Sequence, residues 1–267
     1  MKKNNIVSII IPTFNSSNEL GYVLSLIHKY SSCTVFVIDD GSEPSEAKKN
    51  KELCKTYSCD YIYTKNNGPS HARHVGLLQV QTQFCFFLDS DDYISEKAIE
   101  YGIDFLVSKP FIDAITFRSY YVNKIELINN KNTNKKVIIK SGNGLFQHVI
   151  ECIGYPRSYI LGWNQSNTLY RTEILKKIYK IRSLSWGEDI PLKLQLISKL
   201  TLAATDLYGQ SQIKISYGRG YSYSIRQIHD LALEVFNTIR GVKGIIMALI
   251  ITVRYYASYL FKKIKLK

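Results

Sequence analysis

Three carboxylates that follow one short apolar run are the side chains best suited to chemistry in this chain. Residues 84–88 (Phe-Cys-Phe-Phe-Leu) indicate a buried strand, and Asp89, Asp91 and Asp92 come directly after it. Ligands of an open α/β sheet bind beyond the carboxyl ends of its strands, where these acids would lie. Carboxylates this close repel one another, so a hard divalent ion shared with substrate phosphates is the simplest partner. An acidic turn that caps the helix expected from about Ser95 is the alternative interpretation.

A second pair of acids, Asp39 and Asp40, ends the apolar run at 34–38. Either carboxylate could accept a hydrogen bond from a base N–H or from a ribose hydroxyl. A carboxylate in that role favours a ring that presents an N–H, such as uracil. The alternative is a plain turn, since Asp-Gly-Ser at 40–42 is ordinary turn chemistry. We favour the ligand role because both acids follow a strand.

A glycine-bearing basic turn, Gly68-Pro-Ser-His-Ala-Arg73, lies between the two acidic clusters and leads into a helix. Gly68 permits close approach of the backbone to a ligand, and a helix N-terminus favours anions. Arg73, one turn into the helix, can meet a phosphate, although a solvated arginine is the alternative. His71 and His74 flank the arginine, and the polarity of a phosphate-binding loop explains both without a catalytic role.

A further acidic pair, Glu188 and Asp189, precedes an apolar segment with helical spacing at 190–200. Acids at a helix N-terminus are also explained by favourable interaction with the helix dipole. The functional interpretation is a general base that takes a proton from an acceptor hydroxyl.

The elements that must position these side chains alternate between strands and helices. Strands are expected at 7–11, 34–38, 61–63, 84–88 and 114–117, with helical segments of ten to fifteen residues among them. This alternation predicts an α/β fold, a Rossmann-like and mostly parallel sheet flanked by helices. In such a sheet the ends of two strands, at 39–40 and 89–92, line one crevice. Their convergence favours a nucleotide site over separate capping turns.

The bulk composition fits a globular enzyme of 267 residues, with 45% hydrophobic and 21% charged side chains. The formal net charge of +13 suits nucleic acid, an anionic membrane surface or phosphorylated substrates as partners. The five cysteines have no C-x-x-C pair, so we expect reduced thiols rather than disulfides or a zinc site. The N-terminus enters a strand without an apolar signal region, and no apolar run reaches about 18 residues. We therefore expect a cytoplasmic protein.

The C-terminal segment combines helical apolar spacing from Ile228 with basic charge. After Glu234 the sequence contains no acid and several lysines and arginines. We expect one long amphipathic helix that binds an anionic membrane surface, peripherally on the inner face of the cell membrane. A packed helix and a subunit interface are the alternatives.

Taken together, these stretches make the chain resemble glycosyltransferase family 2, the inverting GT-A enzymes of bacterial surface-polysaccharide synthesis. Each fragment is weak alone, and five in the same order are a strong match. The clear match covers about residues 6–120, with a thinner match to about 225. The matching stretches are 8–15 (Ser-Ile-Ile-Ile-Pro-Thr-Phe-Asn), 37–42 (Val-Ile-Asp-Asp-Gly-Ser), 68–76, 87–92 (Phe-Leu-Asp-Ser-Asp-Asp) and 187–189 (Gly-Glu-Asp).

The resemblance implies a role for each candidate side chain. Asp91, with Asp89, would bind Mg²⁺ or Mn²⁺ at the diphosphate in a D-x-D pattern. Asp189 would be the general base, with Glu188 beside it. The positions implied to line the nucleotide sugar are Pro12, Thr13, Asn15, Asp39, Asp40, Gly68, Arg73, Asp89, Ser90 and Arg219. Two departures are His74, where the family often has Asn, and 217–223, which matches the family's late basic loop only loosely.

The implied organisation is a nucleotide-sugar-binding subdomain at 1–120, an acceptor-binding subdomain at 121–225 and a basic helical extension at 226–267. The implied activity is metal-dependent transfer of a hexosyl or N-acetylhexosaminyl group. The donor would be a nucleoside-diphosphate sugar, for which UDP is the expected nucleotide. The acceptor would be a hydroxyl of a saccharide or lipid-linked molecule in capsule or related polysaccharide synthesis. The sequence names neither sugar nor oligomeric state.

Two other classes of protein are weighed against this one. A nucleotidyltransferase would share the sheet and the metal-binding acids, but it usually carries a glycine-rich basic loop where this chain has Pro12-Thr-Phe-Asn15. A basic nucleic-acid- or membrane-binding module without catalysis would use the C-terminal segment as its binding surface. No recognised DNA or RNA motif accompanies that segment, so we expect no nucleic-acid partner.

Overall fold

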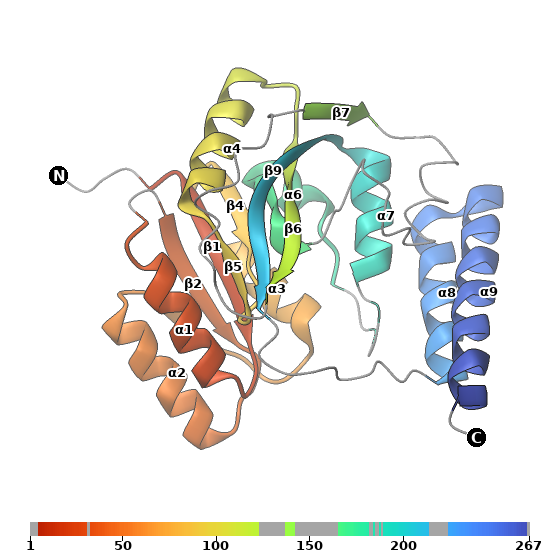
Figure 1. The fold of residues 1–267 in the computed structure, drawn as a ribbon, viewed down its shortest axis with the longest axis horizontal. Coiled ribbons are helices and arrows are strands. Elements are labelled where there is room, and N and C mark those ends of the chain that lie inside the picture. Colours follow the sequence, from red (N-terminus) through yellow and green to blue (C-terminus); the bar gives the residue numbers. More distant parts are fainter. Residues whose placement is uncertain are drawn as a thin grey trace.

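The structure is a computed structural model that describes residues 5–30, 33–122, 137–141, 165–181, 184, 187, 189–213 and 224–265. Within these residues a single mixed sheet has the strand order β3-β2-β1-β4-β8-β6-β9-β5, and β7 pairs with β9. Helices cover both faces of this sheet (Figure 1). The strands are β1 (Val7–Thr13), β2 (Cys33–Asp39), β3 (Asp60–Tyr63), β4 (Phe84–Phe87), β5 (Asp92–Ile94), β6 (Ala114–Val122), β7 (Val137–Ser141), β8 (Thr168–Arg171) and β9 (Thr201–Ile213). The helices are α1 (Ser17–Ile27), α2 (Pro44–Thr56), α3 (Pro69–Gln79), α4 (Glu96–Ser108), α6 (Thr172–Ile178), α7 (Asp189–Lys199), α8 (Ile225–Ile239) and α9 (Gly241–Lys265), with a 3₁₀ turn, η2, at Gln165–Asn167.

Strand β1 is the centre of the parallel part of the sheet. It pairs in parallel with β2 on one side and with β4 on the other, and β2 pairs in parallel with β3. Successive side chains of a strand face opposite sides, and both sides of β1 are buried. Ile9 and Ile11 belong to one core layer with α1 and α4, while Ile10 belongs to a second layer with α3, α6 and α7. The predicted fold class is therefore confirmed.

Helix α3 lies unusually close to the sheet at Gly76. A Cβ atom at Gly76 would collide with the side chain of Ile10 and would come within 3.0 Å of Cγ1 of Ile38. Glycine is therefore required here for the helix to rest on β1 and β2. The same device recurs at Gly102 of α4, where a Cβ atom would lie 2.8 Å from the ring of Phe117.

The second half of the sheet contains three strands that were not predicted from the sequence. Strand β9 pairs in parallel with β6 and antiparallel with β5 and β7, and none of β5, β7 and β9 was expected. Polar residues interrupt β9, and β5 has only three residues placed directly after the acids. The Asn- and Lys-rich composition of 129–136 predicts an exposed loop and the apolar spacing of 145–153 a short helix, and both stretches lie outside the described residues.

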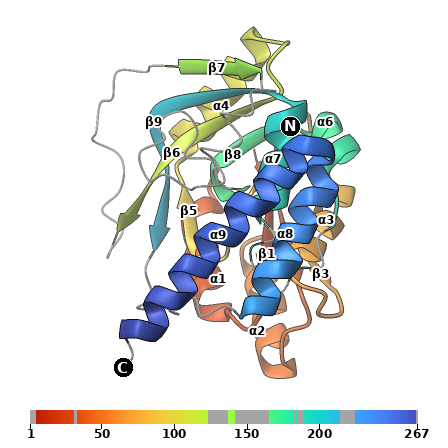
Figure 2. The same cartoon turned by 90° about the vertical axis from the view of Figure 1, so that its right-hand side faces the viewer.

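The C-terminal segment forms a hairpin of two helices, α8 and α9, where one long helix was expected (Figure 2). The chain breaks at Arg240 and Gly241, which have positive φ angles of 57° and 62°. Ser224 and Gln227 form a capping box that starts α8. Buried side chains of α7, α8 and α9 join in a third core cluster, so the hairpin packs on α7. The division into subdomains at residues 120 and 225 stays a prediction.

The described cysteines, Cys33, Cys54, Cys59 and Cys85, are free thiols. Burial raises the pKa of both Cys54 and Cys85 to about 12. Burial therefore favours the protonated form of both thiols, and Cys152 lies outside the described residues.

Candidate active site

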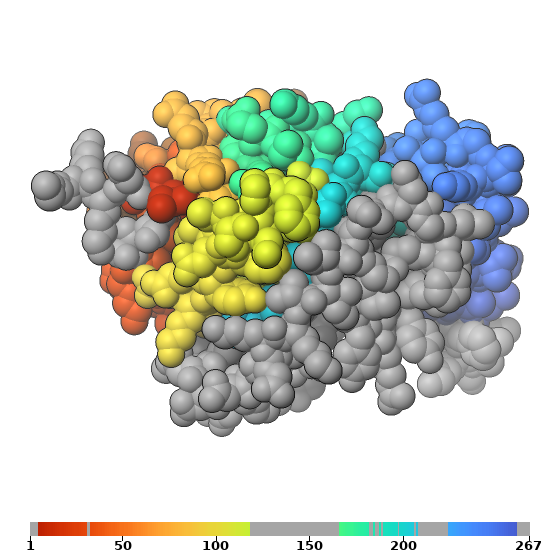
Figure 3. All heavy atoms as spheres, turned by 90° about the horizontal axis from the view of Figure 1, so that it is seen from above, coloured from red at the N-terminus to blue at the C-terminus, as the bar shows by residue number. Residues whose placement is uncertain are grey.

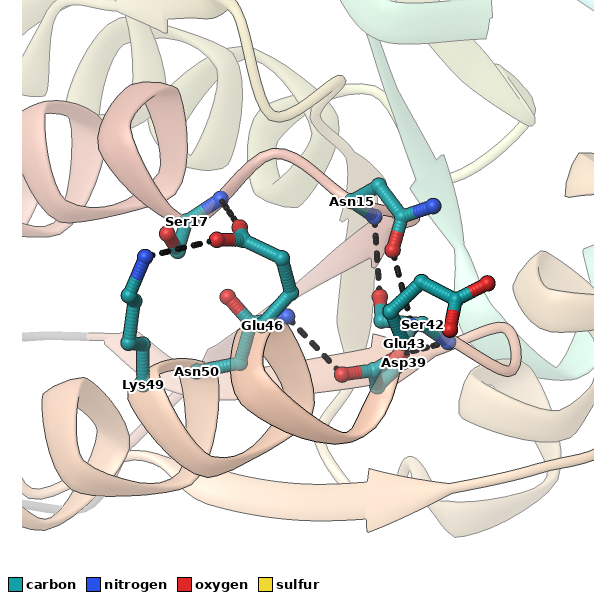
Figure 4. A network of polar contacts seen from close by, with 8 residues as sticks. All are labelled: Asn15, Ser17, Asp39, Ser42, Glu43, Glu46, Lys49 and Asn50. Atoms are coloured by element: carbon teal, nitrogen blue, oxygen red, sulfur yellow. Dashed lines mark hydrogen bonds and ion pairs between the residues drawn. The ribbon is translucent and has the colours of Figure 1, made fainter.

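Asp39, at the end of β2, is completely buried and serves the fold (Figure 4). Its Oδ1 accepts a hydrogen bond from the backbone N–H of Ser42 at 2.9 Å. Its Oδ2 accepts from Nδ2 of Asn50 at 2.8 Å and from the hydroxyl of Tyr61 at 2.9 Å. Both carboxylate oxygens of Asp39 therefore stabilise the β2–α2 turn, and its side chain does not reach the surface of the site.

The turn after β1 is locked to the turn after β2 (Figure 4). Asn15 has a positive φ of 48°, a conformation that asparagine tolerates, and its backbone N–H donates to Oγ of Ser42 at 2.9 Å. In return, the backbone N–H of Glu43 donates to Oδ1 of Asn15 at 2.8 Å. A second link joins Glu46 of α2 to the backbone N–H of Ser17 at 3.1 Å. Asn15 thus fixes the relative positions of two turns at the carboxyl edge.

Asp40 ties β2 to the loop that precedes α3. Its carboxylate accepts hydrogen bonds from the backbone N–H groups of Asn67 at 3.1 Å and Gly68 at 2.8 Å. Burial raises the pKa of Asp40, and these two N–H groups act in the opposite direction. Gly68 has a φ of 90°, which glycine adopts without strain, and Pro69 begins α3 directly after it. Each carboxylate oxygen retains capacity for a second donor, so Asp40 can hold the loop and also meet a ligand.

Hydroxyl groups connect the carboxyl ends of β1 and β4. Oγ1 of Thr13 lies 2.8 Å from Oγ of Ser16, which lies 3.1 Å from Oγ of Ser90. Pro12 and Thr13 are buried at the end of β1. The predicted positions Pro12, Thr13 and Ser90 therefore come together beside Asp40, whose backbone N–H donates to the carbonyl of Thr13 at 2.9 Å.

The three acids after β4 have different surroundings. Asp92 is buried at the start of β5, and its Oδ2 accepts a hydrogen bond from Oγ of Ser166 at 2.9 Å. Asp89 is partly exposed, and Asp91 is exposed. The capping alternative fails for these acids because α4 is capped by Ser95, whose Oγ accepts from the backbone N–H of Ala98 at 3.2 Å. Asp89 and Asp91 are thus the two acids available to a ligand.

Arg73 and Asp89 form an ion pair at the centre of the site. Nη2 of Arg73 lies 2.7 Å from Oδ1 of Asp89, and the arginine side chain is 7% exposed against 31% for the aspartate. A buried guanidinium beside a partly open carboxylate creates a site of mixed charge that suits phosphate and a cation together.

Asp189 begins α7, and the charges of this ion pair act on its carboxyl. Its carboxylate is open to solvent, yet the surrounding protein raises its pKa. The positive charges of Lys193 and Arg73 lower that pKa, and the negative charge of Asp89 raises it further. The structure therefore brings Asp189 into electrostatic range of Arg73 and Asp89, although the three residues are far apart in the sequence. Glu188 and Arg219, the other predicted site residues, lie outside the described residues.

The two histidines of α3 have separate surroundings. The ring of His74 stacks on Tyr179 with the ring centroids 6.0 Å apart, and burial lowers the pKa of His74. His71 lies close enough to Asp40 for its charge to lower the pKa of that carboxyl. Nδ1 of His71 is buried and has no hydrogen-bond partner among the residues that the structure describes. Packing against Tyr179 thus accounts for His74, and the role of His71 stays a prediction.

Two residues of the site were missed by the sequence analysis. Ser166 donates a hydrogen bond to Asp92, which lies 74 residues earlier in the sequence, and no local sequence pattern predicts such a contact. Phe14 is 49% exposed and directly follows Thr13, the last residue of β1. An aromatic residue in an otherwise polar turn was the available signal, because an exposed ring can stack on a base.

The donor set at the site fits a divalent ion that is shared with a substrate. Asp89 and Asp91 offer hard carboxylate oxygens, and no third His, Cys, Asp or Glu of the described part of the chain joins them in a metal-binding group. Mg²⁺ and Mn²⁺ commonly use one or two carboxylates and take their other ligands from phosphates and water. The residues present match that pattern.

Comparison with known proteins gives a consistent result. The model of "Glycosyl transferase family 2" matches residues 8–178, which is well over half of the chain. An uncharacterized glycosyltransferase of Rickettsia conorii is 28% identical over 214 residues, covering 79% of this chain and 33% of that protein. The poly(ribitol-phosphate) β-N-acetylglucosaminyltransferase TarS of Staphylococcus aureus is 28% identical over 193 residues, covering 68% of this chain and 30% of TarS. The chain therefore spans about a third of the length of these relatives.

Solved structures agree with the fold described above. The structure of TarS residues 1–349 with UDP-GlcNAc has a TM-score of 0.61 and 21% identity, covering 95% of this chain and 71% of that one. A mannosyltransferase of Pyrobaculum calidifontis with GDP-Man and Mn²⁺ has a TM-score of 0.58 and 14% identity, covering 93% of this chain and 70% of that one. These likenesses establish the GT-A type of fold. On the extent of the family match, the chain belongs to glycosyl transferase family 2.

Proposed function

We propose that this glycosyltransferase is an inverting, metal-dependent enzyme that uses a UDP-sugar as donor. The acceptor is a hydroxyl of a saccharide or lipid-linked molecule in cell-surface polysaccharide synthesis. The observation that carries the proposal is the convergence of Asp189 with Arg73 and Asp89 at the carboxyl edge of the sheet. The similarity to TarS, a poly(ribitol-phosphate) β-N-acetylglucosaminyltransferase, supports an N-acetylhexosaminyl group and a wall polymer as the first substrates to test.

The proposed reaction is a single in-line displacement. Asp189 takes the proton of the acceptor hydroxyl, and the acceptor oxygen forms a bond to the anomeric carbon. The bond from that carbon to the diphosphate breaks on the opposite face, so the configuration inverts and the nucleoside diphosphate leaves. Arg73 stabilises the negative charge that develops on the diphosphate. A divalent ion held by Asp89 and Asp91 would supply further charge stabilisation there.

The base of the donor is proposed to bind between Asp40 and Phe14. The carboxylate of Asp40 can accept from a ring N–H, and its position is fixed by Asn67 and Gly68. Pro12 and Thr13 form the wall at the end of β1. The ring of Phe14 supplies a face for stacking.

Replacement of Phe14 by Ala is expected to weaken UDP binding by about 5-fold to about 100-fold, because stacking of a base contributes about 1–3 kcal/mol. Isothermal titration calorimetry with UDP and Mn²⁺ measures the change. Phe111→Ala is the matched control, since Phe111 is also exposed but lies between α4 and β6. Equal affinities of the Phe14 variant and wild type would remove Phe14 from the base site.

The rate of transfer is expected to fall as the pH is lowered through the raised pKa of Asp189. Only the deprotonated carboxylate can accept a proton, and desolvation by the surrounding protein raises that pKa above the ordinary value of about 3.9. On the acidic side of the pH profile, kcat should therefore begin to fall at a pH above the range in which an ordinary aspartate titrates. Lys193→Met removes a charge that lowers this pKa, so this fall should move to higher pH. A fall that stays at the same pH in the variant would mean that another group controls it.

The first experiment is calorimetric binding of a panel of nucleoside diphosphates, with and without Mn²⁺. Metal-dependent binding of UDP supports the proposal. Binding of GDP instead, as in the GDP-Man complex of the Pyrobaculum enzyme, would keep the enzyme class and change the donor. Binding of none of them by the folded protein would overturn the proposal and favour a module without catalysis.

Residues 121–225 are proposed to form the acceptor side, together with Asp189 at the start of α7. The acceptor hydroxyl has to approach Asp189 from the open side of its carboxylate. This arrangement separates the acceptor elements from the donor elements β1, β2 and α3.

A further inference from the structure

An exposed apolar stripe runs along the outer face of α9. Its members are spaced by three or four residues, so they lie on one side of the helix. Their exposed fractions lie between 43% and 73%. The residues of this α9 stripe are Val242, Ile245, Leu249, Val253, Tyr256 and Leu260.

The opposite face of α9 is already used by the fold. Met247 and Ile251 are completely buried in a cluster with Leu194 of α7 and with Leu231 and Val235 of α8. The hairpin lies side by side with α7 at the end of the molecule opposite α1 and α2 (Figures 1 and 2). The space-filling view shows residues of the hairpin, in blue, projecting at that same end (Figure 3). The α9 stripe is therefore a second apolar face, separate from the one that holds the helix in place.

The charge of α9 identifies what can cover this stripe. The helix contains no acid, and its basic residues are Lys243, Arg254, Lys262, Lys263 and Lys265. Lys243 is exposed near the start, and the guanidinium of Arg254 lies over the ring of Tyr255 at 4.7 Å. A pairing of stripes from two copies would bring two basic helices without an acid side by side, and like charges repel. An anionic lipid surface instead matches both the apolar stripe and the basic charge.

The segment Gly241–Leu260 is long and apolar enough to cross a membrane by length and composition, and 17% of its most apolar window is buried. Crossing would place Arg254 in the hydrocarbon and would remove Met247 and Ile251 from the core that they share with α7 and α8. Both costs vanish when the helix lies in the plane of the membrane surface. We therefore propose that α9 docks in plane on an anionic bilayer, with its stripe at the acyl boundary and its basic residues at the lipid phosphates.

The test is cosedimentation of the full chain with lipid vesicles. Vesicles of phosphatidylcholine alone are compared with vesicles that contain about 30% phosphatidylglycerol, as an anionic inner-leaflet surface would. Wild type is expected to bind the anionic vesicles at least about tenfold more tightly than the neutral ones, and high salt should weaken this binding.

The double variant Leu249→Gln with Val253→Gln is expected to lose at least about tenfold of this affinity, because it removes the centre of the stripe. The matched control is Leu78→Gln with Val107→Gln, two side chains of α3 and α4 with comparable exposure, which should bind as wild type does. Both variants change exposed positions, and circular dichroism melts verify that both remain folded.

Four outcomes would overturn the inference. Wild type could remain in the supernatant with both kinds of vesicle, or the two double variants could lose binding equally. Sedimentation velocity could instead reveal a wild-type dimer that the Leu249 and Val253 variant dissociates, which would assign the stripe to a second copy. Resistance of bound protein to alkaline carbonate extraction would replace in-plane docking by a spanning helix. None of these measurements requires a donor or acceptor, so the inference succeeds or fails separately from the proposed reaction.

Discussion

Asp189→Asn is expected to lower the rate of sugar transfer by at least about 1,000-fold while changing UDP affinity by less than about threefold. A positioned general base contributes about 10²–10⁴-fold, and the amide of asparagine cannot accept the proton of the acceptor hydroxyl. The variant keeps the shape of the side chain at the start of α7. UDP release from UDP-GlcNAc, with poly(ribitol phosphate) as acceptor, measures the rate, and calorimetry measures UDP affinity.

The matched control for this prediction is Glu173→Gln, an acid in the first turn of α6. It removes the same kind of helix-dipole interaction far from the ion pair, so transfer should continue at the wild-type rate. Loss of UDP binding in Asp189→Asn would assign a structural role to Asp189. An unchanged transfer rate would move the general base to another group.

Asp91→Asn is expected to remove the effect of Mn²⁺ on UDP binding, with at least about a 100-fold loss of affinity in the presence of the metal. An amide oxygen is a much weaker ligand for a hard cation than a carboxylate. Because Asp91 is exposed, the substitution should leave the free energy of unfolding nearly unchanged. Calorimetry with UDP, with and without Mn²⁺, provides the measurement.

The neighbouring variant Asp92→Asn separates the metal site from the fold. Asp92 is buried and accepts the hydroxyl of Ser166, so its substitution should reduce the free energy of unfolding by about 1–3 kcal/mol and leave the metal effect intact. If Asp92→Asn abolished the metal effect and Asp91→Asn did not, the assignment of the two acids would be reversed.

Apolar runs that end in acids were enough to predict the donor half of the fold. The strands at β1, β2 and β4 and the basic turn before α3 lie where the sequence analysis expected them. The separate roles of adjacent acids could not be predicted from the sequence, because they depend on hydrogen-bond partners that are distant in the sequence. Asp39 is held by Asn50 and Tyr61, which are 11 and 22 residues away, and only folding reveals that it faces inward.

The C-terminal half was less predictable for two physical reasons. The helical spacing of apolar residues continues from Ile239 to Val242 across the break, so periodicity alone indicates one helix. The break itself needs the positive φ angles of Arg240 and Gly241, of which only the glycine is visible in the sequence. Strand β9 is stabilised by its pairing with β6, whereas its own mixed composition does not indicate a strand.

The contact of α3 with β1 at Gly76 has a consequence for how the enzyme adapts to its substrates. A helix without room for one methyl group between itself and the sheet cannot slide or tilt, because packed interiors resist small displacements. Arg73, carried by that helix, is therefore presented in a fixed place before any ligand arrives. In the proposed reaction Arg73 would lose little conformational entropy on meeting the diphosphate, which would favour tight and rapid binding of the nucleotide. Adaptation to different acceptors must then come from elements other than α3.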